Sequence, residues 1–315
     1  MNQDLIVDIE NVRNLLLDKI GSQIPLINSM IHHSFKKNGK NIRTQILLST
    51  AIALEVPTTN FNLYLSSVII ELIHAGSLAH DDVIDQNPIR RGQLATHEAF
   101  SNTKSILLGD YFFTKAYLLA HELPSKILFL DYLAQTAHDL VEGEFIQLEY
   151  QQQEITLDIY LKIISKKTAS LFSLATTSVG MLFSPEHIKL LLEIGSNFGI
   201  FFQLIDDYLD YFGSESLLGK ASGHDFKEKK MTLPLFFINT NIKNKFLEKF
   251  FNNLISFEET LEILNTCKFE CQSFIESYAL KTISLLKKLP NKEPLTKLIE
   301  DRLSLITMVE EPALS

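Results

Sequence analysis

Residues 62–85 read NLYLSSVIIELIHAGSLAHDDVID, an apolar run that ends in the acidic cluster Asp81-Asp82-Val83-Ile84-Asp85. Helical periodicity in this run predicts a long helix. Asn87-Pro88 marks its end, because proline disfavours a helical residue before it. The arrangement returns at residues 188–211, IKLLLEIGSNFGIFFQLIDDYLDY, which also contain a DDxxD cluster near their end. We therefore expect two central helices, each with an acidic C-terminal end.

Helical periodicity extends over most of the chain, whereas the alternating pattern of β-strands is absent. The low counts of glycine (12) and proline (9) suit long helices. No Gly/Ser tract, proline-rich stretch or block of one charge marks a linker. We therefore expect one all-α domain over residues 1–315, without strands. Further helices are expected at residues 5–20, 42–54, 107–119, 127–150, 157–165, 168–181, 233–237, 246–254, 259–265 and 274–288, with a polar loop at 213–229.

The composition excludes some classes of function. A net charge of −9 and a pI of about 5.5 argue against nucleic acid as the main partner, since phosphate backbones need clustered Lys and Arg. Cys267 and Cys271 form no zinc or disulfide framework and are expected to be thiols on a helix. The N-terminus has no signal-peptide pattern, and no apolar run reaches roughly 18 residues. We expect a cytoplasmic protein with no transmembrane segment.

The two acidic clusters indicate bound cations. Asp81 and Asp85 are one helical turn apart, and like charges at this spacing destabilise a helix by about 0.2–0.5 kcal/mol per pair. Desolvation beside buried apolar turns adds to that cost. Carboxylate oxygens select Mg²⁺ or Ca²⁺, and Mg²⁺ typically binds one or two carboxylates together with substrate phosphates. The clusters therefore predict a phosphorylated ligand held through Mg²⁺. The candidate metal ligands are Asp81, Asp82, Asp85, Asp206, Asp207 and Asp210.

Basic residues lie in the loops near these clusters. Backbone N–H groups at a helix start favour anions, and arginine suits bidentate phosphate binding. Each basic residue alone has the pattern of a solvated surface cation, but the ordered series predicts a diphosphate site. Lys40 and Arg43 stand at one predicted helix start and Lys167-Thr168 at another, Arg90 and Arg91 follow the first cluster, and Lys220 and Lys230 lie in and after the loop beyond the second.

Together these features resemble the trans-isoprenyl diphosphate synthases, or polyprenyl synthases, over residues from about 37 to 234. The two aspartate clusters are similar to the family's two aspartate-rich motifs. Two departures stand out. Gly-Gly-Lys-x-x-Arg-Pro reads Asn38-Gly39-Lys40-Asn41-Ile42-Arg43-Thr44, and the glycine before the last lysine is Lys229. The second departure leaves Lys229 and Lys230 as candidates for the diphosphate contact, and we favour Lys230, two residues before Thr232. Further matching segments are Glu71-Leu72-Ile73-His74, Arg90-Arg91-Gly92, Gly109-Asp110-Tyr111, Glu142-Gly143-Glu144, Lys167-Thr168 and Lys230-Met231-Thr232-Leu233-Pro234.

The resemblance implies an isoprenoid-synthase-type helical bundle with a central active-site cavity, acting as a homodimer. It implies that an allylic diphosphate ionises, that the double bond of isopentenyl diphosphate attacks the carbocation, and that the resulting cation loses a proton to the departed diphosphate. The allylic diphosphate would bind through Mg²⁺ to Asp81, Asp82, Asp85 and Asp206, and directly to Arg90, Lys167 and Lys230. Isopentenyl diphosphate would bind Lys40, Arg43, His74 and Arg91 without metal. Thr168 and Gln203 would either steady the carbocation or be ordinary hydrogen-bonded helix residues.

Residues before Asp81 on its helix predict the product length. By helical geometry, Gly76 and Ser77, then Ile73, face the cavity wall at about 5.4 Å per turn. A bulky aromatic there would block a growing chain, whereas Gly76 and Ser77 leave an open path. We expect a medium- or long-chain product, such as octaprenyl diphosphate for a quinone side chain. A farnesyl or geranylgeranyl synthase is the alternative.

Three other classes of protein share part of the pattern. A class I terpene cyclase has DDxxD on an all-α core, but its second metal site is normally an Asn/Asp–Ser/Thr–Glu triad. A phosphohydrolase of the His-Asp type would fit His80-Asp81, but further histidine ligands at suitable spacing are not evident. A non-catalytic subunit of a heteromeric synthase would tend to lose aspartates, and both clusters are complete here.

Overall fold

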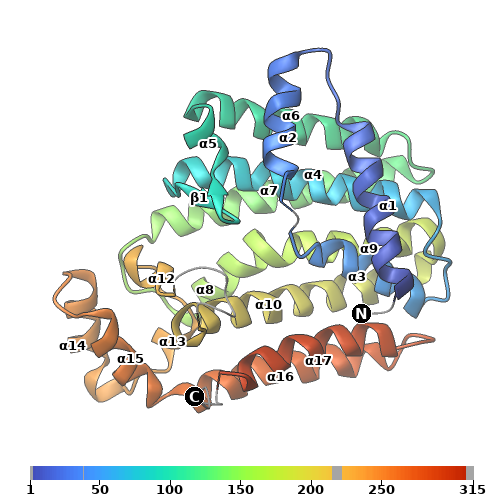
Figure 1. The fold of residues 1–315 in the computed structure, drawn as a ribbon. Helices are drawn as coiled ribbons and strands as arrows, with labels where there is room; N and C mark the ends of the chain where they lie inside the picture. Colours follow the sequence, from blue (N-terminus) through green and yellow to red (C-terminus); the bar gives the residue numbers. More distant parts are fainter. Residues whose placement is uncertain (1–2, 38, 215–221, 310–315) are drawn as a thin grey trace. The chain divides into compact units, whose positions relative to one another are not determined.

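A computed structural model describes residues 3–37, 39–214 and 222–309 as helices joined by loops, with one small β-hairpin (Figure 1). The all-α class is confirmed. The chain divides into two compact units whose segments alternate along the sequence. Unit 1 comprises Met1–His138, Leu171–Gly195 and Leu289–Leu295, and unit 2 comprises Asp139–Ser170, Ser196–Lys288 and Thr296–Ser315. A single domain over residues 1–315 stays a prediction.

The elements follow one another along the chain in a nearly unbroken series of helices. They are α1 (Gln3–Lys19), α2 (Pro25–Phe35), α3 (Ile42–Ala53), α4 (Phe61–Ile84), β1 (Ile89–Arg90), β2 (Gln93–Leu94), α5 (Thr96–Ala99), α6 (Asn102–Ala120), α7 (Lys126–Glu149), α8 (Leu157–Ile164), the π-helical turn η1 (Ser165–Ala169), α9 (Ser170–Phe183), the 3₁₀ turn η2 (Pro185–His187), α10 (Ile188–Phe212), α12 (His224–Lys227), α13 (Leu233–Phe236), α14 (Thr240–Phe251), α15 (Phe257–Asn265), α16 (Lys268–Leu286) and α17 (Glu293–Thr307).

The core of unit 1 is built on α4, which packs along α6 (Figure 1). The side chain of Asn60 caps the first turn of α4. Small residues let the two helices approach closely, because a Cβ on Gly76 would lie only 3.1 Å from the Gly109 carbonyl oxygen. About one turn nearer to the aspartate cluster, the Ser105 hydroxyl on α6 donates a hydrogen bond of 2.9 Å to the Ala79 carbonyl oxygen on α4. These contacts fix the end of α4 that carries the first aspartate cluster.

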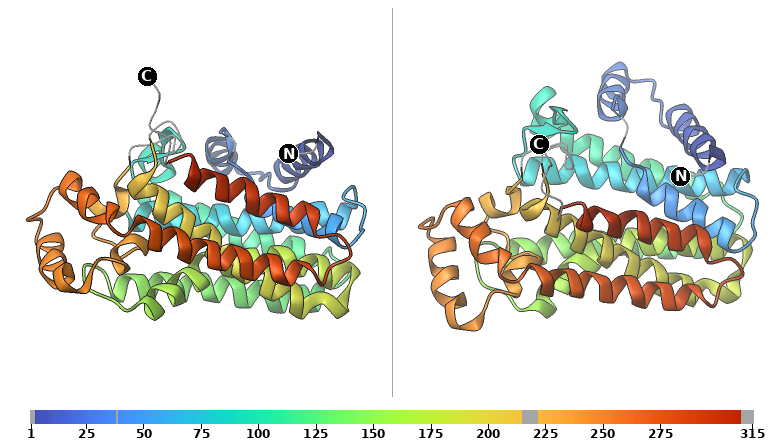
Figure 2. Two further views of the ribbon diagram at one scale, coloured as in Figure 1. Left: turned by 90° about the horizontal axis from the view of Figure 1, so that it is seen from below. Right: turned by 60° about the horizontal axis from the view of Figure 1, so that its bottom comes forward.

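Unit 2 combines the second aspartate cluster on α10 with the C-terminal helices α16 and α17, which lie side by side in both views of Figure 2. The Gln272 amide on α16 donates to the Tyr208 hydroxyl on α10 at 2.9 Å. The Arg302 guanidinium on α17 lies 5.0 Å from the centre of the Phe202 ring. Helices from the end of the chain therefore support the helix that carries the second cluster.

The β-hairpin corrects the expectation that strands are absent. Strands β1 and β2 pair antiparallel, and the two turn residues between them, Arg91 and Gly92, have φ of 52° and 67°. Positive φ at both central residues is the mark of a type I′ turn, whose twist suits two paired strands. Each strand has two residues, which is too short for an alternating pattern to show in the sequence.

Three α-helices, α2, α5 and α17, were not predicted, and α12 lies within the predicted polar loop. In α17 the buried residues Leu295, Ile299 and Ile306 lie on one face among charged residues, a helical period that the sequence prediction did not use. The predicted helices at 42–54 and 188–211 agree with α3 and α10 to within one residue.

Two helices are long and apolar enough to span a membrane when judged by length and composition alone. They are Phe61–Ile84 and Pro185–Phe212, and 56% and 50% of their most apolar windows are buried within the protein. Core helices of folded proteins meet the same criterion, and each of these two carries an aspartate cluster near its end.

Candidate active site

The first aspartate cluster lies at the C-terminal end of α4, as predicted. Asp85 follows the last helical residue, and its N–H donates to the Asp81 carbonyl oxygen at 2.8 Å. Asp82 is buried, and its Oδ1 accepts hydrogen bonds from two guanidinium nitrogens of Arg90, one of them Nε at 2.9 Å. Arg90 is therefore an ion-pair partner of Asp82 in this structure.

A cavity of about 90 Å³ in unit 1 adjoins this cluster and is lined by His74, Arg90 and Arg91, together with Glu71 and Asp82. Burial holds the pKa of His74 well below its usual value. The nearby positive charges of arginines act in the same direction. A neutral imidazole can still donate one N–H to an anion, so this cavity presents donors and positive charge together.

Lys40 and Arg43 frame the start of α3, as predicted. Lys40 is exposed and precedes the helix, whereas Arg43 lies in its first turn. The Arg43 guanidinium lies 4.9 Å from the centre of the Phe172 ring, a cation–π contact. The two residues therefore keep their place at the helix start, but Arg43 is held on an aromatic face.

Of the two departures in this segment, Asn38 lies outside the described residues and Thr44 lies in the first turn of α3, whereas Gly39 keeps the glycine of the family pattern. A Cβ on Gly39 would lie 2.5 Å from a guanidinium nitrogen of Arg91, so glycine leaves room for that side chain. Thr44 stands where the family pattern has proline, and its hydroxyl donates to Glu71 Oε1 at 2.9 Å. Proline has no such donor. The substitution therefore ties α3 to a carboxylate that lines the cavity.

The second aspartate cluster on α10 presents its three carboxylates differently. Asp206 is exposed, whereas Asp207 and Asp210 are buried. Asp210 Oδ2 accepts the Asp225 N–H at 2.8 Å, and the Asp210 carbonyl oxygen accepts the Gly223 N–H at 2.7 Å. Asp210 thus anchors the loop that follows α10, and Asp206 is the residue of this cluster that solvent reaches most readily.

Thr168 hydrogen-bonds to Gln203, which in turn hydrogen-bonds to the second cluster. The Thr168 hydroxyl donates to Gln203 Oε1 at 2.9 Å, and Gln203 Nε2 donates to Asp207 Oδ1 at 2.7 Å. The buried Tyr160 hydroxyl donates to Asp207 Oδ2. Burial raises the pKa of Asp207 to about 7. Tyr160 was missed by the sequence analysis; its only signal is its place about two helical turns before Lys167.

Lys167 does not begin a helix, contrary to the prediction, but lies within the π-helical turn η1. Helix continues from α8 through η1 into α9, and the Ser170 N–H donates to the Ser165 carbonyl oxygen five residues back. Such turns recur at functional sites. Gly143 on α7 makes room for it, because a Cβ there would lie 2.8 Å from the Lys167 backbone nitrogen.

Lysines of this turn contact carboxylates that the sequence analysis left without a role. The Lys167 ammonium pairs with Glu144. Lys166 pairs with Asp139 at 2.6 Å and with Glu142 at 2.7 Å, and hydrogen bonds to both raise the pKa of Lys166. All three acids lie on α7. In the segment Glu142-Gly143-Glu144, the glycine therefore leaves space for the π turn, and the two glutamates compensate the positive charge of its lysines.

The structure separates the two candidate lysines after the second cluster. The Lys230 ammonium pairs with Glu228, and the Lys230 side chain is 20% exposed. Lys229 is 6% exposed, and its ammonium lies over the rings of Phe226 and Phe250. The geometry therefore favours Lys230 for a phosphate contact. Lys220 lies outside the described residues.

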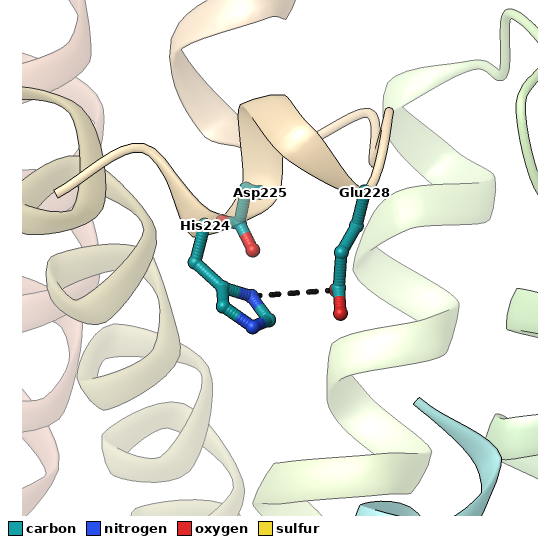
Figure 3. Close-up of side chains that lie close together, drawn as sticks. All are labelled: His224, Asp225 and Glu228. Carbon is teal, nitrogen blue, oxygen red and sulfur yellow. Dashed lines mark ion pairs between the residues drawn. The ribbon is translucent and has the colours of Figure 1, made fainter. Parts of the chain in front are cut away.

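A further group of possible ligands lies on α12 (Figure 3). His224, Asp225 and Glu228 each offer one ligand atom within 4.8 Å of the others, and His224 Nδ1 lies 3.4 Å from Glu228 Oε2. The sequence analysis did not single out this group. The Lys230 ammonium already pairs with Glu228, so a cation of the protein itself occupies part of this cluster.

The residues predicted to set product length lie in different surroundings. Ile73 is fully buried, and the Ser77 hydroxyl donates to the His74 carbonyl oxygen at 2.9 Å. Gly76 does not leave the open path that was predicted, because a Cβ there would lie 2.7 Å from the Phe113 ring on α6. Phe113 was missed because its sequence position, far from Asp81, gives no sign of this contact.

The donors fit a hard divalent cation. Asp81 and Asp85 are half-buried one turn apart, and Asp206 is exposed, so each cluster offers carboxylate oxygens of the kind that Mg²⁺ or Ca²⁺ prefers. The C-terminal end of a helix carries partial negative charge, which adds to the attraction at both clusters.

A family model described as polyprenyl synthetase matches residues 24–265. The chain belongs to the polyprenyl synthetase family. It is 35% identical over 238 residues to an octaprenyl diphosphate synthase of Escherichia coli, covering 75% of this chain and 73% of that protein. It is 32% identical over 256 residues to a geranylgeranyl diphosphate synthase of Methanosarcina mazei, covering 78% and 77%.

A solved structure of a polyprenyl synthase from Caulobacter crescentus, complexed with calcium and isoprenyl diphosphate, has the same fold. The TM-score is 0.85 at 28% identity, over 95% of this chain and 94% of that one. As a polyprenyl synthetase, the chain is a trans-prenyltransferase that condenses isoprenyl diphosphates. Members of the polyprenyl synthetase family use a divalent metal.

Proposed function

We propose that this polyprenyl synthetase makes a medium- or long-chain all-trans polyprenyl diphosphate with Mg²⁺ as its metal. The observation that carries the metal dependence is the pair of complete aspartate clusters at the C-terminal ends of α4 and α10. Asp81, Asp85 and Asp206 are the members that solvent reaches. Similarity to an octaprenyl diphosphate synthase over three quarters of the chain supports the product class.

The allylic diphosphate binds Asp81, Asp82, Asp85 and Asp206 through Mg²⁺ in this proposal, and Arg90, Lys167 and Lys230 directly. When bound, Mg²⁺ supplies Lewis-acid stabilisation of the departing diphosphate. Carboxylates pair with these cations in the structure, with Glu144 on Lys167 and Glu228 on Lys230. The incoming diphosphate then exchanges with carboxylates that already fix where each ammonium lies. Thr168 and Gln203 orient Asp207 through their hydrogen bonds.

Isopentenyl diphosphate binds in unit 1, at the start of α3 and the cavity beside it. The exposed N–H groups of a helix start attract anions, and Lys40 and Arg43 stand there. His74 and Arg91 line the cavity, and the neutral His74 donates a hydrogen bond without adding charge. Catalysis then consists of positioning and electrostatic stabilisation, with no side-chain nucleophile.

The test is product analysis. The purified chain is incubated with Mg²⁺, labelled isopentenyl diphosphate and an allylic primer, and the products are separated by length. We expect a ladder that ends at one medium- or long-chain prenyl diphosphate. A product no longer than geranylgeranyl diphosphate would overturn the length assignment, and no product from folded chain with metal would overturn the function.

Two sets of variants sharpen this test. Loss of one metal-binding carboxylate in Asp81→Asn or Asp206→Asn removes several kcal/mol of transition-state stabilisation, a loss of about 100-fold or more in turnover. The exposed Asp131→Asn on α7 is the matched control and keeps its activity. Ser77→Phe adds an aromatic ring one turn before Asp81, and we expect a shorter final product.

The same proposal includes a homodimer. Leu107 and Leu118 on α6 are 61% and 66% exposed, and Ile127 at the start of α7 is 75% exposed. Leu107 and Leu118 are three helical turns apart and therefore share one face. Large exposed apolar side chains that share a face mark a protein contact, and a second copy of this chain is the partner that we propose.

A further inference from the structure

Lys229 stands where the family pattern has glycine, and its backbone shows why glycine suits the position. Its φ is 56°, in the left-handed region that side chains with a Cβ rarely adopt. Despite this strain the residue is only 6% exposed. Burial lowers the pKa of its ammonium. A buried lysine with strained backbone lowers the stability of the folded state unless its contacts compensate.

The Lys229 ammonium is held by aromatic rings of unit 2. Its Nζ lies 4.4 Å from the centre of the Phe226 ring on α12 and 4.7 Å from that of Phe250 on α14. A cation this close to two ring faces is attracted by both, and more strongly when water is excluded. The two rings also contact each other, with centres 5.6 Å apart. Lys229 thus joins α12 and α14.

The aromatic cluster extends to the helix that carries the second aspartate motif. Phe226 contacts Phe257 on α15 at 5.5 Å, and Phe257 contacts Tyr211 near the end of α10 at 6.2 Å. Gly223 fits closely against Phe257, because a Cβ there would lie 2.8 Å from the ring. The segment from Gly223 to Lys230 is therefore fastened at both ends.

The residue next to Lys229 is the one that carries a predicted substrate contact. The Lys230 N–H donates to the Asp225 carbonyl oxygen at 3.0 Å, and its ammonium pairs with Glu228. Asp225 in turn donates its N–H to Asp210 of the second cluster. Any movement of Lys229 out of its aromatic contacts shifts the backbone that fixes Lys230.

We propose that Lys229 is a positioning residue: its cation–π contacts with Phe226 and Phe250 hold the substrate-facing segment of α12 and the residues after it, and so place Lys230 for the allylic diphosphate. This inference rests on the proposed function for the identity of the ligand. The tether, by which we mean the cation–π contacts of Lys229 with Phe226 and Phe250, does not depend on the proposed function. It attaches the segment from Gly223 to Lys230 to α14 whatever the reaction. Lys229 itself acts only through its neighbour.

The test compares Lys229→Met, Lys229→Arg and Lys229→Gly in the full chain, with Lys281→Met as the matched control. Lys281 is an exposed lysine 5.8 Å from the ring of Tyr278 on α16. KM is measured separately for the allylic diphosphate and for isopentenyl diphosphate, with kcat and melting temperature. Binding of inorganic diphosphate with Mg²⁺ is measured by calorimetry, so the tether is tested even if no turnover is found.

Loss of the cation in Lys229→Met should raise the allylic KM and weaken diphosphate binding about tenfold, the equivalent of one cation–π contact away from water. In Lys229→Met the KM for isopentenyl diphosphate should stay within about twofold of the wild-type value. In the Lys281→Met control both KM values and diphosphate binding should stay within the same limit. Lys229→Arg should restore the wild-type values, because arginine also makes cation–π contacts.

Lys229→Gly separates backbone strain from the tether. It removes the strained side chain and should melt no lower than Lys229→Met, while its allylic KM stays raised. Unchanged diphosphate binding in Lys229→Met, or an equal rise in both KM values, would overturn the proposal. A wild-type chain that binds diphosphate but makes no prenyl product would refute the proposed function alone.

Discussion

His74 is a histidine that its surroundings keep neutral. Burial lowers its pKa well below the usual value, and the guanidinium groups of Arg43, Arg91 and Arg90 lower it further. A site that must attract a diphosphate needs fixed positive charge, which the arginines supply at any pH that the protein meets. The imidazole can then serve as a hydrogen-bond donor whose state does not change near neutral pH.

The lowered pKa of His74 makes the free energy of unfolding depend on pH. Because the folded-state pKa lies below the unfolded value of about 6.5, the unfolded chain binds the proton first as pH falls. Stability contributed by the neutral His74 is therefore lost as pH drops below about 6.5. We expect the melting temperature of the wild type to fall more between neutral and mildly acidic pH than that of His74→Gln. The exposed His121→Gln should follow the wild type, and identical pH profiles for His74→Gln and wild type would contradict this account.

Residue chemistry could be predicted from the sequence, whereas residue partners could not. The aspartates and lysines are named by their type and spacing, and the end of a helix places Asp81 and Asp85 on one turn. The contacts of Lys167 with Glu144, and of Asp207 with Tyr160, depend on how separate helices pack. Neither pair is adjacent in the sequence, so no local pattern signals it.

At the scale of elements, the π turn depends on a glycine of another helix. Gly143→Ala places a methyl group 2.8 Å from the Lys167 backbone nitrogen, and backbone cannot give way as a side chain can. Overpacking of this kind costs about 1–3 kcal/mol. We expect a lower melting temperature together with a raised allylic KM, because Lys167 is displaced. Thermal melts and kinetics measure both.

Gly21→Ala is the matched control for that variant. Nothing lies within 4 Å of the position that its Cβ would take, so the melting temperature should stay at or above the wild-type value. A Gly143→Ala protein that melts and binds like Gly21→Ala would show that the π turn tolerates the methyl group.

Long apolar helices could be predicted, and departures from regular helix could not. Helices α4 and α10 have enough turns for their periodicity to be plain, and both were predicted with acidic ends. The π turn adds a single residue to a helix, and the β-hairpin depends on two residues with positive φ. Neither feature changes the apolar pattern enough to be seen in the sequence.

At the scale of the whole molecule, the proposed homodimer depends on the exposed apolar face of α6. Leu107→Glu places a charge on that face, and burying an unpaired carboxylate in an apolar contact is unfavourable. We expect the variant to elute as a monomer in size-exclusion chromatography with light scattering. Leu254→Glu, at a leucine that is 69% exposed outside α6, should leave the assembly unchanged. A wild-type monomer at micromolar concentration would refute the homodimer.

The fold class followed from composition and periodicity, because both average over many residues. The division of the chain into two units did not, since each unit gathers segments that are distant in the sequence. Periodicity reports which face of a helix is buried but not which helix covers it.

The contact of α16 with α10 has a consequence for protein fragments. The family match ends at residue 265. Beyond that residue, however, the Gln272 amide donates a hydrogen bond to Tyr208 within the second aspartate cluster, and Cys271 and Ile275 are fully buried. A truncated chain that stopped at the family boundary would leave α10 with an uncovered apolar side. Boundaries chosen for expression from the family match alone would therefore yield an aggregating piece, although every aspartate would still be present.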